Sequence, residues 1–194
     1  MKMMLGHVWR FILIVLVGSI GSMISGLILY GAEIVNPLSP GYYFIVYGLS
    51  TSILFGCYHI WGLGRTIIAA LAVSTLFFIV IAVTFHMPIL HSVFWAFGIN
   101  MPVVVLVFLF ERKLVYFKQW KFLVVGIMYG AVFVFISGLV GLITRVSSMP
   151  PEYFQKNFVD GLALGIGLGI GVEIAESLIH SVDLHLEARR GNKK

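Results

Sequence analysis

The feature that most constrains this chain is a series of six apolar segments, each close in length to the hydrocarbon core of a bilayer. A transmembrane helix needs about 20 predominantly apolar residues. Segments of this kind lie at residues 11–30, 42–61, 67–85, 93–110, 122–143 and 159–179. The sequence therefore predicts an all-α integral membrane protein, a single bundle of six transmembrane helices that ends in a tail at residues 181–194.

Composition separates this chain from soluble proteins. Hydrophobic residues make up 60% of the 194 residues and charged residues only 11%, which is far from the usage of a soluble domain. The net charge of +5 does not point to nucleic acid, because the basic residues cluster between apolar segments and at the chain ends. Membrane lipids are therefore the expected partners, and nucleic acid is not expected to bind. The single cysteine, Cys57, excludes an internal disulfide.

The distribution of lysine and arginine predicts the orientation in the membrane. If the six segments cross in turn, one side holds eleven of these residues, and the other side holds two, Arg145 and Lys156. Lysine and arginine are enriched in cytoplasmic loops. Both termini are therefore predicted to be cytoplasmic, in a cell membrane that we take to be the inner or plasma membrane of a prokaryote.

Small residues recur at intervals of four in three of the segments. Such spacing places them on one helix face and lets two helix backbones approach closely. The residues predicted to pack helices in this way are Gly18, Ser22, Gly26, Gly126, Gly130, Gly161, Gly165 and Gly169. The same pattern would suit a second copy of the chain or another membrane subunit, so a homo-oligomer or a partner subunit stays open.

The last segment runs from its glycines into Glu173, Glu176 and His180. An ionisable group in the bilayer is costly, so such residues are candidates for function. With both termini inside, His59 and Arg65 fall at a similar depth on other helices. We expect one polar cluster, in which Glu173 pairs with Arg65 or His59.

The second segment begins with Tyr42, Tyr43 and Tyr47, which we interpret as an interfacial aromatic belt. Ser50 and Ser52 follow near mid-depth, where hydroxyls bond their own backbone or a neighbouring helix. In a transporter the same two hydroxyls would line the pathway of a solute.

Asn100 lies at mid-depth in the fourth segment, two residues before Pro102. A buried amide must find a hydrogen-bond partner, and proline frees a backbone carbonyl one turn upstream. Asn100 is therefore predicted either to bond a neighbouring helix at a structural kink or to line a pathway with Ser50, Ser52 and Glu173.

The end of the last segment contains residues that could bind a metal ion. Carboxylate oxygen and imidazole nitrogen are usual ligands of zinc and iron. Secondary candidates of this type are Glu176, His180, Asp183 and His185. The chain has no His-Glu-x-x-His motif, and a charged helix at the membrane surface explains Asp183 and His185 equally well. No cofactor is expected.

Three classes of function fit these observations. The first is a small-solute transporter or a membrane subunit of a transport system, with Glu173 in the pathway. The second is a non-catalytic membrane partner or assembly factor that binds other membrane helices through its small residues. The third is a membrane-embedded metal-dependent or lipid-modifying enzyme that uses Glu173, Glu176 and His180.

Overall fold

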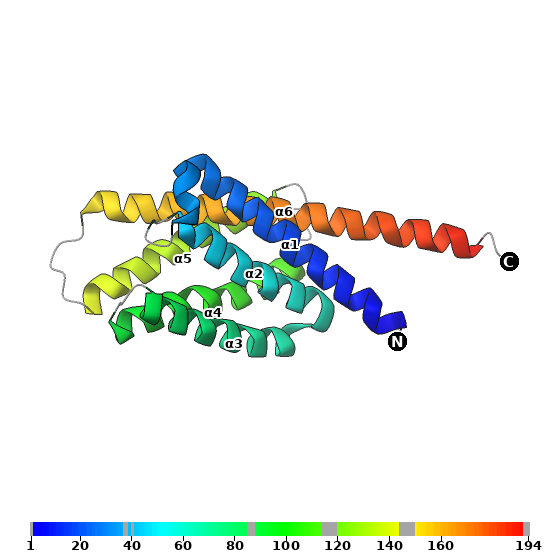
Figure 1. Ribbon diagram of the computed structural model, residues 1–194, viewed down its shortest axis with the longest axis horizontal. Coiled ribbons are helices and arrows are strands. Elements are labelled where there is room, and N and C mark those ends of the chain that lie inside the picture. The colour runs from blue at the N-terminus through cyan, green and yellow to red at the C-terminus, as the bar shows by residue number, and fades with distance from the viewer. Residues whose placement is uncertain are drawn as a thin grey trace.

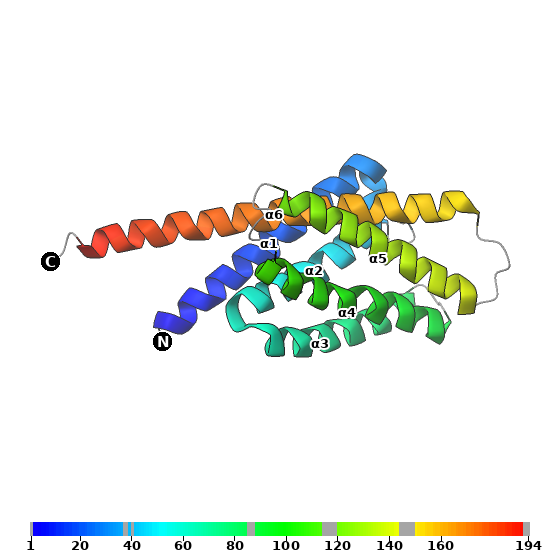
Figure 2. The ribbon, with the colours of Figure 1, turned by 180° about the vertical axis from the view of Figure 1, so that it is seen from behind.

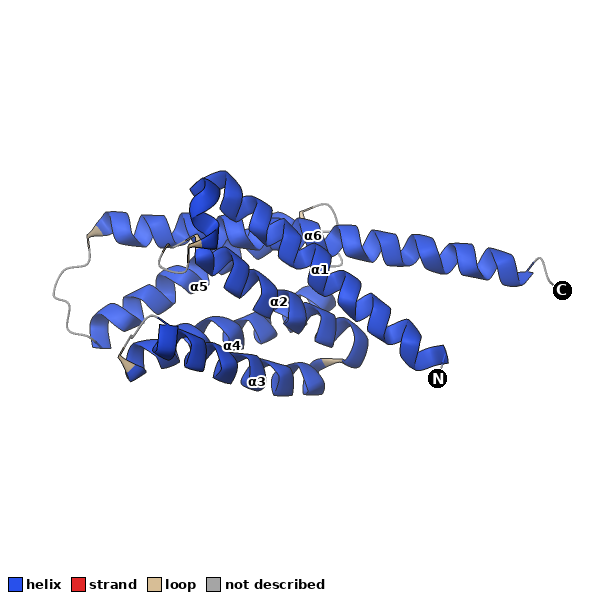
Figure 3. Ribbon diagram, in the orientation of Figure 1, coloured by secondary structure: helices blue, strands red, loops and turns tan. Residues whose placement is uncertain are grey.

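The computed structural model describes residues 2–36, 39, 41–84, 88–113, 120–143 and 150–191. Within these ranges, the side chains of residues 2–5, 84, 106–113, 121–122, 140, 143 and 185–191 fall outside the description. The described elements are helical (Figure 3): α1 (Lys2–Tyr30), the short 3-10 helix η1 (Gly31–Val35), α2 (Tyr42–Trp61), α3 (Leu63–Thr84), α4 (Ile89–Lys113), α5 (Lys121–Ile143) and α6 (Pro151–Gly191). The prediction of an all-α fold is confirmed.

The helix boundaries follow local sequence. Gly62 ends α2 with a φ of 77°, a conformation that side chains other than glycine rarely adopt, and its N–H donates to Tyr58 O at 2.9 Å. α3 then begins at Leu63, so α2 and α3 are joined by a single residue. α4 continues through Pro102, so this proline does not end the helix.

Two helices occupy the middle of the bundle. α6 lies between α1 on one side and α5 on the other, as the two opposite views show (Figure 1, Figure 2). α2 contacts α1, α3, α4 and α6. α3 and α4 pack together at the edge of the bundle farthest from α6 (Figure 1). The residues that can form an internal site therefore lie mainly on α2 and α6.

Glycine backbones form the contact between α5 and α6. A Cβ atom added to Gly161 would lie 2.8 Å from Cα of Gly130, and one added to Gly165 would lie 2.8 Å from Cα of Gly126. Real Cβ atoms essentially never come that close to backbone. The two helices can pack at this distance only because these positions have no side chains, as the spacing of the glycines predicts.

A second glycine face of α6 packs on α1. A Cβ atom on Gly171 would lie 2.8 Å from Cα of Gly18, and Gly167 lies directly against Gly21. Gly169, which the sequence also singles out, is buried. α6 therefore uses two glycine faces, one for α5 and one for α1, which explains why its apolar run is so rich in glycine.

The remaining small residues of α1 pack on α2. Ser22 is fully buried, and its hydroxyl donates to Phe44 O at 2.8 Å. A Cβ atom on Gly26 would lie 2.7 Å from Cβ of Phe44, and one on Gly18 would lie 2.7 Å from Oγ of Ser52. These small residues are thus occupied by contacts within the chain, which removes them as an argument for binding helices of another protein.

The outer surface is apolar. Ile12, Leu16, Ile20 and Ile24 form a stripe on α1 in which each residue is 48–55% exposed. Large exposed apolar surfaces are rare in soluble monomers and are the normal surface of a protein in lipid. Among the described residues, four helical segments are long and apolar enough to cross a membrane, and α4 and α5 contain shorter apolar segments: Gly6–Val35, Tyr42–Trp61, Leu63–Val83 and Pro151–Leu184, then Ile89–Val105 and Leu123–Leu139.

Both ends of the chain lie at one end of the bundle (Figure 1). α6 has 41 residues and is roughly 60 Å long, about twice the hydrocarbon thickness of a bilayer. Its C-terminal part extends past the other helices, whereas its first turns lie at the opposite end (Figure 1). The candidate residues Glu173, Glu176, His180 and Asp183 all belong to the C-terminal half of α6.

Candidate functional site

A histidine and a carboxylate meet at the end of the bundle where the termini lie. Nδ1 of His59 on α2 is 3.7 Å from Oε1 of Glu176 on α6. Their side chains are 39% and 29% exposed, so water can reach the pair. An ion pair of this exposure contributes little stability, and it forms only when the histidine is protonated.

Glu173 lies one turn before Glu176 on α6. One of its carboxylate oxygens is buried, and the residue lines a shallow groove of about 350 Å³. The other residues of this α6 groove all belong to the same helix: Ile170, Ile174, Ser177, Leu178 and Ser181. Ser177 donates its hydroxyl proton to the carbonyl oxygen of Glu173 at 2.9 Å, so this hydroxyl is used within the helix.

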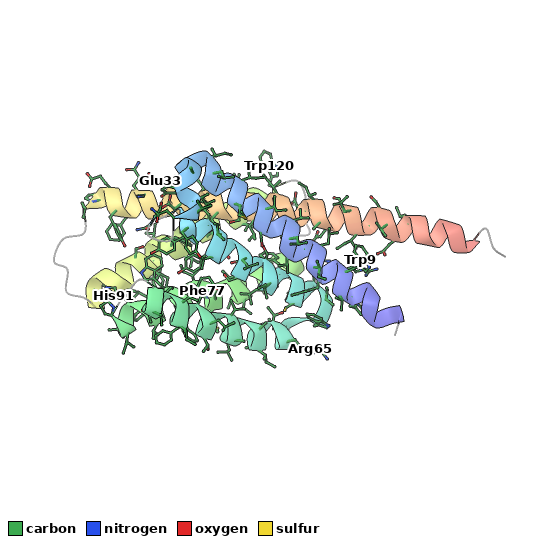
Figure 4. All side chains as sticks on the ribbon, viewed as in Figure 1. Trp9, Glu33, Arg65, Phe77, His91 and Trp120 are labelled. Atoms are coloured by element: carbon green, nitrogen blue, oxygen red, sulfur yellow. The ribbon has the colours of Figure 1, made fainter. Side chains whose placement is uncertain are left out.

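Two other members of the predicted polar cluster are exposed. Arg65 is an exposed residue at the start of α3, and Figure 4 shows it at the edge of the molecule away from α6. His180 is exposed on α6. Arg65 is thus apart from the residues of α6, because α3 packs on α2 and α4.

The predicted metal ligands do not converge in the described part of the chain. No three described histidine, cysteine, aspartate or glutamate side chains lie close enough together to hold a metal ion. Asp183 accepts two hydrogen bonds from Nη2 of Arg10, at 2.7 and 2.8 Å, and so joins α6 to α1. The side chain of His185 lies outside the described residues.

Asn100, Ser50 and Ser52 are fully buried or nearly so. The Asn100 amide donates to Ala96 O at 2.9 Å and accepts from the Ser50 hydroxyl at 3.1 Å, which links α4 to α2. Ser52 donates to Gly48 O at 2.7 Å. The predicted bond between Asn100 and a neighbouring helix is confirmed. Asn100, Ser50 and Ser52 do not line the α6 groove, nor do they line the pocket at the end of the bundle opposite the termini.

A pocket of about 250 Å³ lies at the end of the bundle opposite the termini. It is lined by side chains from α2, α4, α5 and α6, so four helices enclose it. The lining residues are Tyr43, Phe44, Trp95, Phe133, Tyr153, Lys156, Asn157, Asp160 and Leu164. We refer to it as the aromatic pocket.

Aromatic rings form most of its wall. The rings of Tyr43 and Trp95 are parallel within 4°, with centroids 6.1 Å apart, and Phe133 meets Trp95 edge-on, also at 6.1 Å. Tyr47, directly behind them, is fully buried and donates its hydroxyl proton to Trp95 O at 2.9 Å. The interpretation of Tyr43 and Tyr47 as an interfacial belt is therefore wrong for Tyr47, whose ring is part of the core.

The polar wall of the aromatic pocket belongs to the first turns of α6. Asp160 is half-buried, and the hydroxyl of Tyr30 on α1 donates to its two carboxylate oxygens at 2.7 and 2.8 Å. Lys156, one turn earlier, is exposed, and its Nζ lies 5.6 Å from the centre of the Tyr30 ring. The pocket thus combines five aromatic side chains with one acidic and one basic side chain.

Sequence reasoning did not find this pocket. Its lining is spread over more than 120 positions of the chain, from Tyr43 to Leu164, and the lining residues do not form a recognisable sequence motif. Asp160 marks the start of the apolar run of the last segment, which reads as a helix boundary. The available signal was a carboxylate and a lysine one turn apart, next to apolar sequence, on the side of the predicted bundle that has few lysine and arginine residues.

Comparison with protein-family models, with curated proteins and with solved structures found no match to this chain.

Proposed function

We propose that the protein binds a small solute in the aromatic pocket and is a transporter, or the membrane subunit of a transport system, in the cell membrane. The observation that supports this best is the pocket itself, enclosed by four helices and lined by aromatic rings and by the charged residues Lys156 and Asp160. Apolar cavities with a few convergent polar groups are the usual binding sites for small molecules. Its volume of about 250 Å³ suits a solute smaller than a typical drug.

In this proposal both termini are cytoplasmic and the aromatic pocket opens towards the outside. The excess of lysine and arginine on the terminal side of the six segments supports the orientation, eleven against two. A site at the outer end that is open to its surroundings would be the point at which an imported solute is captured.

We place the inner end of the pathway at Glu173 and at the pair of His59 and Glu176. Asp160 and Glu173 are 13 residues apart on α6, which is roughly 20 Å along the helix. One rigid helix thus joins the pocket to the polar residues near the termini, so a movement of α6 would change both ends together.

The proposal predicts that the binding of solutes requires the side chains that line the pocket. Purified protein in detergent would be screened with small solutes, and binding would be detected as a rise in Tm. Stabilisation should disappear in Tyr153→Ala, because Tyr153 lines the pocket and is only half-buried.

Tyr58→Ala is the matched control. Tyr58 is also half-buried, but it lies in the last turn of α2, away from the pocket lining. Stabilising solutes should keep their effect in this variant. If every solute that stabilises the protein acts equally on Tyr153→Ala, the pocket is not the binding site and the proposal fails.

A further inference from the structure

We infer that the aromatic pocket selects a zwitterion that carries an ammonium group and a carboxylate, an inference that rests on the proposed function. The two charged side chains of the pocket, Asp160 and Lys156, have opposite signs and lie one turn apart on the same face of α6. A ligand with one positive and one negative group matches both, and it adds no net charge to a site at the membrane.

Asp160 is the partner of the ammonium group. It is half-buried at the pocket wall, and the Tyr30 hydroxyl fixes its orientation by bonding both carboxylate oxygens. A carboxylate has about four acceptor positions, so the bond from Tyr30 leaves capacity for a cation. The bond to Tyr30 therefore orients the carboxylate and does not replace a ligand.

The aromatic rings favour an ammonium group over a neutral group of the same shape. Tyr43, Trp95, Phe133 and Tyr153 all line the cavity that Asp160 enters. The faces of such rings are electronegative, and groups of aromatic residues are the usual sites for quaternary ammonium ions. A methylated ammonium fits best, since its methyl groups contact the rings while its charge faces Asp160.

Lys156 is the partner of the carboxylate. It is exposed, and its Nζ lies over the Tyr30 ring, so its ammonium group is at the rim of the pocket. A cavity of 250 Å³ holds about eight water volumes, which leaves room for only a short chain between the two charges of the ligand. Glycine betaine has this size and both charges.

Three probes of matched shape test the inference by calorimetry or by the change in Tm of the purified protein. Glycine betaine carries both charges, choline keeps the ammonium without the carboxylate, and 3,3-dimethylbutanoate keeps the carboxylate with carbon in place of nitrogen. Glycine betaine should bind about tenfold more tightly than either of the others, the ratio that about 1.4 kcal/mol produces.

Two variants assign the charges. Lys156→Gln, at an exposed position, should make glycine betaine and choline bind alike. Asp160→Asn should reduce the preference for glycine betaine over 3,3-dimethylbutanoate to the part that the aromatic rings provide. Tyr30→Phe removes the hydroxyl but keeps the carboxylate, so it should retain the preference for glycine betaine. It shows whether Asp160→Asn acts through its lost charge or through a weakened bond to α1.

The outcomes separate the inference from the function on which it rests. Equal binding of glycine betaine and 3,3-dimethylbutanoate, or tighter binding of choline, would overturn the inference that the pocket selects a zwitterion. So would the absence of binding by all three probes while other solutes stabilise the wild-type protein and not Tyr153→Ala, a result that leaves the proposed function intact. An unchanged preference in Lys156→Gln would also contradict it.

Discussion

Replacing Gly165 with leucine is expected to prevent α5 and α6 from docking, so that the protein no longer folds to a single species in detergent. A Cβ atom at this position would lie 2.7 Å from Val125 O and 2.8 Å from Cα of Gly126. Both atoms belong to the backbone of α5, so no side-chain rotation relieves the contact. The helices would have to separate, and α6 would lose its fit on α1 as well, where Gly167 and Gly171 pack.

The smaller change Gly165→Ala gives a measurable version of the same effect. Overpacking of a close contact costs about 1–3 kcal/mol. The free energy of unfolding, measured by titrating SDS into mixed micelles, should fall by that amount, although alanine favours a helix more than glycine does.

Gly138→Ala is the control, because it makes the same chemical change on α5. Its nearest neighbour would be Cε1 of Phe154 at 3.8 Å, an ordinary contact distance. This variant should be as stable as the wild type or slightly more stable. Equal stability of Gly165→Ala and Gly138→Ala would show that the close approach of α5 and α6 is absent in the folded protein.

Replacing Trp95 with alanine is expected to abolish solute binding and to lower the free energy of unfolding by about 3–5 kcal/mol, the usual cost of deleting a buried tryptophan. Trp95 is only 9% exposed, and its ring contacts both Tyr43 and Phe133. Its loss would remove one wall of the pocket and open the core behind it. Binding would be followed with any solute that raises the Tm of the wild-type protein.

Two further variants separate binding from stability. Trp95→Phe keeps an aromatic ring and should recover part of the binding. Trp61→Ala removes a tryptophan that is 38% exposed. Trp61 is the last residue of α2, at the end away from the pocket, and it contacts Phe11. This variant should bind solute normally. Loss of binding in Trp61→Ala as severe as in Trp95→Ala would mean that general destabilisation, and not the pocket, explains the effect.

The helices and their packing faces follow from sequence, because apolar length and glycine spacing are local signals. Gly161, Gly165, Gly126 and Gly130 meet as their intervals of four predict. The second glycine face of α6, with Gly167 and Gly171, overlaps the first in sequence. A helix enclosed on two sides has two interleaved patterns, and only the fold shows which glycine meets which neighbour.

The candidate site is less predictable, since it depends on which helices become neighbours. The predicted order of the segments associated His59 with the glutamates of α6, and the structure brings it within 3.7 Å of Glu176. Depth alone did not show that Arg65 faces away from α6. It also gave no reason to connect Asp183 with Arg10, which lies 173 residues earlier and forms its ion pair.

The aromatic pocket was missed for the same reason. Tyr43 and Trp95 belong to different helices, and each has an ordinary interpretation in a membrane protein as an interfacial or core aromatic residue. Only the packing of α4 on α2 and α5 turns them into two walls of one cavity. Aromatic residues and a carboxylate that lie at the same end of predicted helices can line one pocket, even when no sequence motif joins them.

The central claim, a solute pocket open to the outside at the end opposite the termini, is tested most directly by labelling with a membrane-impermeant maleimide. The background is Cys57→Ala, which removes the only native thiol. In spheroplasts, Asn157→Cys in the pocket should react, whereas Leu184→Cys, exposed near the C-terminal end of α6, should react only after permeabilisation. Reaction of Leu184→Cys in intact spheroplasts, with Asn157→Cys protected until permeabilisation, would contradict the account.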